Sequence, residues 1–251
     1  MPYSHYQEID RKQAFKQIRH LLTGAALLAA TAGFINAVSL GFFRTPVSHM
    51  TGAVSHLGID IAEMRPEEAM TSASIVLGFL AGALLAGLVV GAWKLIPSRR
   101  YGVALMIEGL LLALATGLLV NKTRLALPVV AMACGLQNAT ASSYCGLMIR
   151  TTHVTGTVTD IGVMLGHWIR HRQIDTWKLR FLVTLFLSFG AGGWAGALAN
   201  MHFGPQALGV AAAGCIIAGA IFWFVTHRGI VDLMQGAVPR PPRTSSFPTD
   251  R

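Results

Sequence analysis

Six long apolar blocks divide this chain of 251 residues, and they limit its fold more than any other feature of the sequence. Each block is long enough to cross the hydrocarbon core of a bilayer as a helix, which takes about 20 residues. Only Lys94 and Glu108 carry a formal charge within them. We therefore predict an all-α, polytopic membrane bundle with six transmembrane helices, at residues 21–43, 70–96, 101–121, 125–148, 181–201 and 206–226.

The composition agrees with a membrane protein. Hydrophobic residues make up 53% of the chain and charged residues only 12%, whereas a soluble domain carries about 25% charged residues. The formal charge of +9 would suit nucleic acid, but an integral membrane protein also gathers basic residues in its cytoplasmic loops. We therefore expect the lipid bilayer as a partner and no nucleic acid.

The basic residues also predict an orientation. With the N-terminus inside, sixteen of the 20 Lys and Arg residues fall on the cytoplasmic side, so the positive-inside rule places both termini in the cytoplasm. We expect a basic cytoplasmic arm at 1–20, one membrane domain at 21–228 and a disordered cytoplasmic tail at 229–251, where proline and polar residues prevail.

An internal repeat divides the membrane domain in two. Residues 32–37 resemble residues 134–139, and residues 49–58 resemble residues 153–162, at offsets of 102 and 104. A weaker match pairs Phe79 and its neighbours with Phe189. Repeat one would cover 21–121 and repeat two 125–226; because each holds three spans, the second copy would be inverted in the membrane, as in many secondary transporters.

Two amphipathic segments, 46–62 and 152–168, are too short and too polar to span alone. We interpret them as broken or re-entrant half-helices, whose N-termini present free N–H groups and a positive potential to an anion. The alternative is that each His-x-Thr-Gly element is a capped surface turn between two helices. The candidate binding residues in and beside these segments are His49, Thr51, Gly52, Arg150, Thr152, His153, Thr155 and Gly156.

Polar residues inside the spans supply the other candidates. Asn36 and Asn138 occupy equivalent repeat positions, and Gln137 precedes the second. They either belong to a central site or form hydrogen bonds between helices. Glu108 is the acid deepest in a span and is a candidate for carrying a coupling proton; its alternative is a structural hydrogen bond or ion pair.

The remaining patterns indicate packing rather than catalysis. Cys134, Cys145 and Cys215 show no metal-binding spacing, and His167 and His171 stand beside arginines that would repel a cation. The GxxxG spacings at 78–82, 87–91 and 192–196 permit close helix packing, within the bundle or in a homodimer. The sequence contains none of the common hydrolase, metalloprotease or nucleotide-binding motifs, so we expect no enzyme, no cofactor and no metal.

At the Gly-Leu-Gln-Asn-Ala run (135–139) and the Arg-Thr-Thr-x-Val-Thr-Gly element (150–156), the chain resembles the YoaK family of uncharacterised bacterial inner-membrane proteins. The resemblance covers residues 20–228 and includes the Met-Thr-Gly at 50–52. Family members commonly carry Asn after this first Thr-Gly, where this chain has Ala53. The resemblance implies six helices and an inner-membrane location, and it implies no particular activity.

These observations favour a small-solute secondary transporter that works by alternating access, with an anion or carboxylate as the expected solute. The main alternative is a membrane scaffold or accessory protein, in which the repeated polar residues only hold the bundle together. A membrane enzyme acting on a lipid or quinone is a third and weaker interpretation, because the repeat distributes polar residues to both sides.

Overall fold

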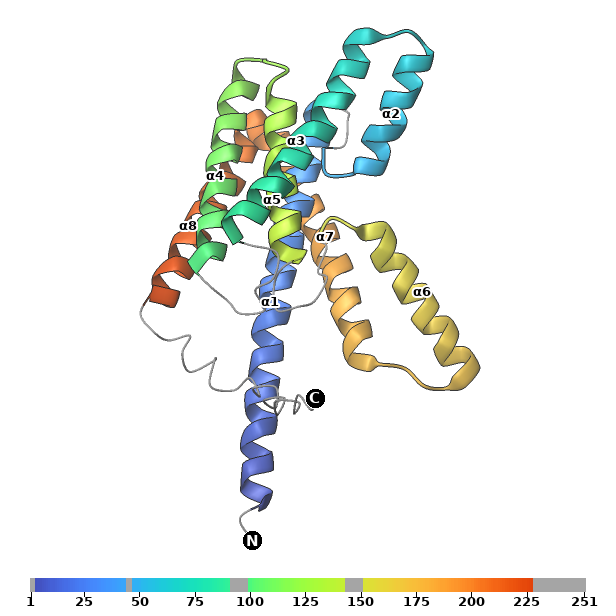
Figure 1. Ribbon diagram of the computed structural model, residues 1–251, viewed down its shortest axis with the longest axis vertical. Coiled ribbons are helices and arrows are strands. Elements are labelled where there is room, and N and C mark those ends of the chain that lie inside the picture. Colours follow the sequence, from blue (N-terminus) through green and yellow to red (C-terminus); the bar gives the residue numbers. More distant parts are fainter. Residues whose placement is uncertain (1–2, 44–46, 91–98, 143–150, 228–251) are drawn as a thin grey trace, which may run out of the picture.

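A computed structural model describes residues 3–43, 47–90, 99–142 and 151–227, and these residues fold as helices (Figure 1). The predicted all-α class is confirmed. The helices are α1 (Tyr3–Phe43), α2 (Met50–Ala62), α3 (Pro66–Val90), α4 (Arg99–Val120), α5 (Ala126–Ser142), α6 (Val154–His171), α7 (Thr176–Phe203), the 3-10 turn η1 (Gly204–Gln206) and α8 (Ala207–His227).

Four helical segments of the described chain are long and apolar enough to cross a membrane. They are Leu22–Phe43, Pro66–Val90, Arg99–Val120 and Thr176–Thr226, and the last of these contains both α7 and α8. Helix α5 is apolar but shorter. Large hydrophobic side chains such as Leu84, Leu88 and Trp194 are exposed on the outside of the bundle, which suits contact with lipid tails. The chain is therefore a multi-pass membrane protein.

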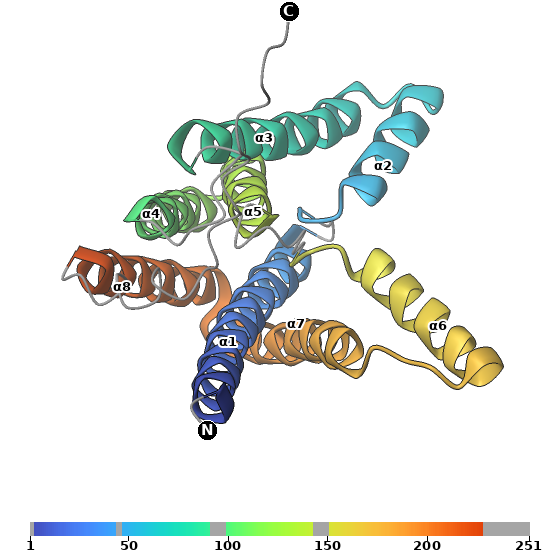
Figure 2. The same ribbon diagram turned by 60° about the horizontal axis from the view of Figure 1, so that its bottom comes forward.

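Three close helix pairs form the body of the bundle: α1 with α7, α3 with α5, and α4 with α8 (Figures 1 and 2). Helix α4 also packs along α5 and joins two of the pairs. Fully buried side chains, among them Ile35, Leu112, Val130 and Leu208, form the main core at this junction.

Glycines allow the paired helices to touch backbone to backbone. A Cβ added at Gly82 would overlap the Met132 carbonyl, and one added at Gly192 would overlap the Ala30 carbonyl. The GxxxG spacings at 78–82 and 192–196 therefore serve packing within the bundle. Gly87, by contrast, meets no atom that a Cβ would touch, and position 91 lies outside the described residues.

The two short amphipathic segments are separate helices, as the sequence predicts. Helix α2 forms a hairpin with α3 and α6 forms one with α7, and both hairpins project from the same side of the bundle (Figures 1 and 2). Each short helix begins near the middle of the bundle, and in Figure 1 α2 runs toward the top while α6 runs toward the bottom. The buried Asp60 holds the α2 hairpin together by accepting from Ser72 at 3.1 Å and pairing with Arg65 at 3.0 Å.

The predicted helix boundaries differ from the observed ones mainly at the chain's N-terminal arm and in α7. The sequence predicts the arm at 1–20, and from Tyr3 onward it forms the first part of α1. This part of the helix extends beyond the bundle (Figure 1). Helix α7 begins five residues before the predicted 181, because the Asp175 carboxylate caps it by accepting from the backbone N–H groups of Trp177 and Lys178, both at 3.1 Å. The tail at 229–251 lies outside the described residues.

Candidate functional site

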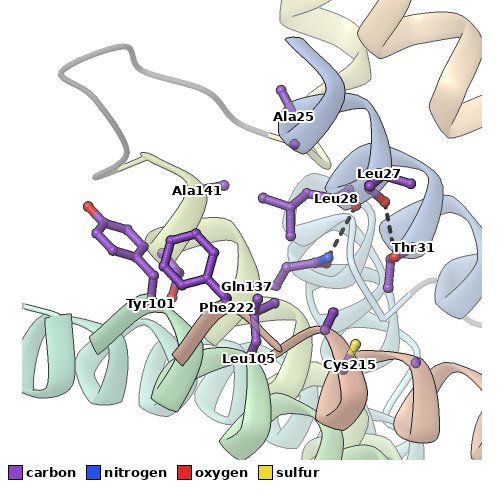
Figure 3. A pocket seen from close by; sticks show the side chains of 14 residues that line it. Ala25, Leu27, Leu28, Thr31, Tyr101, Leu105, Gln137, Ala141, Cys215 and Phe222 are labelled. Carbon is purple, nitrogen blue, oxygen red and sulfur yellow. Dashed lines mark hydrogen bonds between the residues drawn. The ribbon is translucent and has the colours of Figure 1, made fainter. Parts of the chain in front are cut away.

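A cavity of about 240 Å³ opens between α1, α4, α5 and α8 (Figure 3). Its walls are mainly apolar, with Leu28, Leu105 and Phe222 among the larger side chains. Polar groups enter it from Thr31, Gln137, Thr140 and Cys215. The remaining lining residues are Gly24, Ala25, Leu27, Tyr101, Ala141, Gly214 and Ala218.

Gln137 has an unsatisfied polar atom in this cavity wall. Its side chain is only 1% exposed, and its Nε2 donates to the Leu28 carbonyl of α1 at 3.1 Å (Figure 3). Only the nitrogen of the amide can donate to a carbonyl, so this bond fixes which way the amide points. The Oε1 atom is buried without a hydrogen-bond partner among the described residues. A buried acceptor left unpaired costs about 1–3 kcal/mol, so this oxygen marks a place where a partner is missing.

Thr140 lies one helical turn beyond Gln137 and also has a buried side-chain atom without a partner among the described residues. Its side chain is 7% exposed, and its Oγ1 is also buried without a partner in the described part of the chain. Residues three apart on a helix share a face, which brings both groups to the same wall of the cavity. The α5 wall of the cavity therefore has one unpaired acceptor and one unpaired hydroxyl just beneath its surface.

Glu108 of α4 lies behind Cys215, on the α8 side of the cavity. The carboxyl group is 1% exposed and hydrogen bonds with the Cys215 thiol, which lines the cavity. Its Oε1 atom has no partner among the described residues. The predicted proton-coupling residue is thus next to the cavity, separated from it by one side chain.

Asn36 and His49 belong to a different cluster, which joins α1 to the start of α2. The Ser48 hydroxyl donates to Asn36 Oδ1 at 2.8 Å and lies 3.2 Å from His49 Nδ1. The His49 ring is half-buried and meets the Phe189 ring of α7 edge-on, at 6.3 Å between centroids. Burial lowers the pKa of His49 from its usual value, because it disfavours the charged form of the ring.

The candidate residues of the second repeat differ from one another in how deeply they are buried. Asn138 is half-buried in α5, and Thr152 is buried just before α6. His153 is exposed at the N-terminus of α6. Arg150 lies outside the described residues.

The Thr-Gly pairs lie within regular helix rather than at a chain break. Thr51 and Thr155 are exposed in the first turns of α2 and α6. A Cβ at Gly156 would overlap the ring of His153, so this glycine makes room for the histidine that precedes its helix.

Metal binding finds no support in the described residues, which contain no cluster of three His, Cys, Asp or Glu side chains. The rings of His167 and His171 pack edge to face at 5.9 Å near the end of α6. Cys134 and Cys215 are free, buried thiols, and Cys145 lies outside the described residues.

Of the predicted site residues that the structure describes, only Gln137 lines the cavity, and Glu108 lies behind it. The sequence prediction missed Thr31, Thr140 and Cys215. Thr140 could have been found from its i+3 spacing to Gln137 on one helix face. Thr31 and Cys215 come from other helices, and no short-range pattern connects them to Gln137.

Comparison with known proteins identifies a family but no function. No curated protein and no solved structure matches the chain. Residues 24–221, most of the chain and nearly all of its membrane domain, match the family described as "Protein of unknown function (DUF1275)". The chain is therefore a member of the DUF1275 family.

Proposed function

We propose that this protein is a secondary transporter of a small solute that works by alternating access, with six membrane crossings arranged as two inverted repeats. The observation that carries the proposal is an asymmetry between equivalent positions of the two repeats. Residues of α1 and α5 that line the open cavity have repeat equivalents that are packed in the main core.

The helix contacts support the repeat. Gly33 of α1 touches the Phe189 backbone of α7, and Gly135 of α5 touches the Phe79 backbone of α3. The repeat relates the two contacts: Gly33 corresponds to Gly135 at an offset of 102, and Phe79 corresponds to Phe189 at an offset of 110. In both pairs the contacts advance in the same direction along both helices, so the paired helices are parallel, as inverted halves require.

Helices α4 and α8 are equivalent to each other in the repeat, and the contacts between them are related by the same symmetry. Gly102 lies against Gly219, and Gly109 lies against Ala212. At an offset of 110, Gly102 corresponds to Ala212 and Gly109 corresponds to Gly219, so the repeat relates the first contact to the second. These contacts run in opposite directions along the two helices, which is the relation expected of third spans in inverted halves.

The two short helices add a matching side-chain detail. The Ser55 hydroxyl donates to the Thr51 carbonyl at 2.9 Å, and the Thr159 hydroxyl donates to the Thr155 carbonyl at 2.9 Å. The offset of 104 exchanges these bonds as well. Equivalent positions thus have the same local structure despite their different sequences.

The departure from symmetry supports alternating access. Gly24 and Leu28 line the open cavity, whereas their equivalents Ala126 and Val130 are fully buried in the main core. On the facing helices, the cavity-lining residues Gln137 and Thr140 correspond to Ile35 and Val38, which belong to the main core and line no part of the cavity. Exchange of the two arrangements would close the cavity and open its counterpart at the opposite end.

The charge distribution supports a cytoplasmic opening in the present state. The cavity includes Gly24 and Tyr101, close to the basic residues that precede the first span and to Arg99 and Arg100. The positive-inside rule places this end in the cytoplasm. On this proposal Glu108 carries the coupling proton, since its carboxyl group bonds to Cys215, which lines the cavity.

Cysteine accessibility tests the proposal in a background with Cys134 and Cys145 replaced by Ala and Cys215 by Ser. Gly24→Cys should react with a membrane-impermeant maleimide added from the cytoplasmic side, and Ala126→Cys should react, more slowly, from the outside. Gln173→Cys and Asn121→Cys, at exposed turns, serve as the matched inside and outside controls. If Ala126→Cys stays unlabelled while Asn121→Cys reacts fully, the cavity is static and the scaffold interpretation replaces transport.

A further inference from the structure

We infer that the cavity between α1, α4, α5 and α8 binds an uncharged solute that combines a small apolar body with one hydroxyl or amide group, recognised by Gln137 and Thr140. This inference rests on the proposed transport function and specifies the chemical class of the solute. It departs from the anion that the helix N-termini favour.

The size of the cavity sets the size of the solute. At about 240 Å³ it exceeds the cavity of about 150 Å³ that is known to take benzene in an engineered protein core. An aromatic ring with a short polar substituent fits this volume. Leu28, Leu105 and Phe222 would surround the ring with apolar surface.

The polar groups set the hydrogen-bonding chemistry. Gln137 Nε2 is occupied by the Leu28 carbonyl, so the amide offers only its oxygen, an acceptor. The Thr140 hydroxyl can donate as well as accept. Both atoms lie just beneath the cavity surface, so a solute group that both donates and accepts, such as an alcohol or an amide, would pair with both of them after the two side chains rotate toward the cavity.

The lining residues also argue against an ion. None of the residues that the structure places around the cavity has a formal charge. An ion brought there would lose its water without gaining a charged partner, which costs far more than burying a neutral polar group. Glu108 does not change this, because Cys215 lies between its carboxyl group and the cavity.

The test uses a thiol placed in the cavity. A Cβ at Gly24 meets no atom within 4 Å, so Gly24→Cys adds a reporter without a clash. With full-length protein in nanodiscs and the same cysteine-replaced background, the alkylation rate by N-ethylmaleimide is measured against four probes of similar size: benzyl alcohol, toluene, benzoate and benzylammonium. Gly117→Cys, equally unhindered but outside the cavity, controls for effects on the bilayer or the reagent.

Benzyl alcohol should protect Gly24→Cys at concentrations about tenfold below those that toluene requires, while benzoate and benzylammonium give no protection. Gln137→Leu and Thr140→Val, which keep side-chain volume, should each weaken protection by benzyl alcohol about tenfold and leave toluene unaffected. Thr116→Val is the matched control, because the Thr116 hydroxyl bonds to the Leu112 carbonyl in α4 and does not line the cavity.

Three outcomes would overturn the inference. Equal protection by toluene and benzyl alcohol, unchanged in both variants, would make the cavity a site for lipid chains. Preferential protection by benzoate or benzylammonium would assign an ion as solute. Absence of protection by every probe in well-folded protein would remove the binding site.

The accessibility of Ala126→Cys separates this inference from the transport proposal. If benzyl alcohol protects Gly24→Cys while Ala126→Cys stays unlabelled from the outside, the protein has a binding site but no alternating access. Labelling of Ala126→Cys without protection by benzyl alcohol would leave alternating access with a different solute.

Discussion

The Ser48 hydroxyl donates a 2.8 Å hydrogen bond to Asn36 Oδ1, and this bond attaches the segment that leads into α2 to the C-terminal part of α1. Both side chains are buried. Asn36 therefore has a structural partner, whereas Gln137, which the sequence places in the same class, keeps an unpaired oxygen in the cavity wall.

Ser48→Ala should destabilise the protein. The substitution leaves Asn36 Oδ1 buried without its donor, which costs about 1–3 kcal/mol, and the thermal unfolding temperature in detergent should fall accordingly. Ser55→Ala is the matched control, because the exposed Ser55 hydroxyl bonds only to a carbonyl of its own helix. Equal unfolding temperatures for the two variants would contradict a structural role for the Asn36 bond.

Gly192→Ala should destabilise the α1–α7 pair. The added methyl group overlaps the Ala30 carbonyl, and separating two packed helices costs about 1–3 kcal/mol. Gly190→Ala, two positions away, meets no atom within 4 Å and should be neutral or slightly stabilising, because alanine has the higher helix propensity. Thermal unfolding of both variants in detergent measures the difference, and a neutral Gly192→Ala would contradict the close backbone contact.

Arg65→Ala should weaken the α2–α3 hairpin more than an exposed ion-pair deletion does. Asp60 is buried and would lose its cationic partner, at a cost of about 1–3 kcal/mol for the hydrogen-bonded group. Arg124→Ala is the control: it breaks a pair of the same kind with Glu67, at 3.1 Å, in which both side chains are about three-quarters exposed. Such exposed pairs contribute about 0–1 kcal/mol. Hydrogen exchange of the α2 amides should rise in Arg65→Ala and stay unchanged in Arg124→Ala.

The stability of the protein should fall on acidification partly through His49. Because burial lowers the pKa of His49 in the folded state, the unfolded state binds a proton more readily, and stability is lost as the pH falls below roughly 6.5. His49→Gln should reduce the slope of unfolding temperature against pH between about 7.5 and 5.5. His153→Gln, which replaces the exposed equivalent ring, is the control. An unchanged slope in His49→Gln would show that other groups account for the acid sensitivity.

Glu108→Gln should separate solute binding from proton coupling. Glutamine keeps the size of the side chain and can still bond to Cys215, but it cannot carry a proton. Protection of Gly24→Cys by benzyl alcohol should persist, while any pH dependence of Ala126→Cys labelling should disappear. A pH dependence that survives the substitution would exclude Glu108 as the coupling residue. Because Cys215 contacts Glu108, these measurements keep Cys215 in place and use a reagent concentration at which the buried thiol reacts slowly.

The sequence by itself determined the helical class, the membrane location and the two short helices. Long uninterrupted apolar runs must satisfy their backbone hydrogen bonds internally in lipid, and helix is the local solution. The glycine spacings at 78–82 and 192–196 also predicted close packing, because only small residues let helix backbones touch.

Only the tertiary structure decided which polar residues are paired and which are left unpaired around the cavity. Gln137 and Leu28 are 109 positions apart, and Cys215 of α8 meets Glu108 of α4 although the two residues are 107 positions apart in the sequence. Similar apolar helices can pack in many arrangements that local pattern does not distinguish, because their outward faces are all acceptable to lipid. The choice of α1 with α7, α3 with α5 and α4 with α8 therefore comes from side-chain and backbone contacts between distant segments, and that choice creates the cavity.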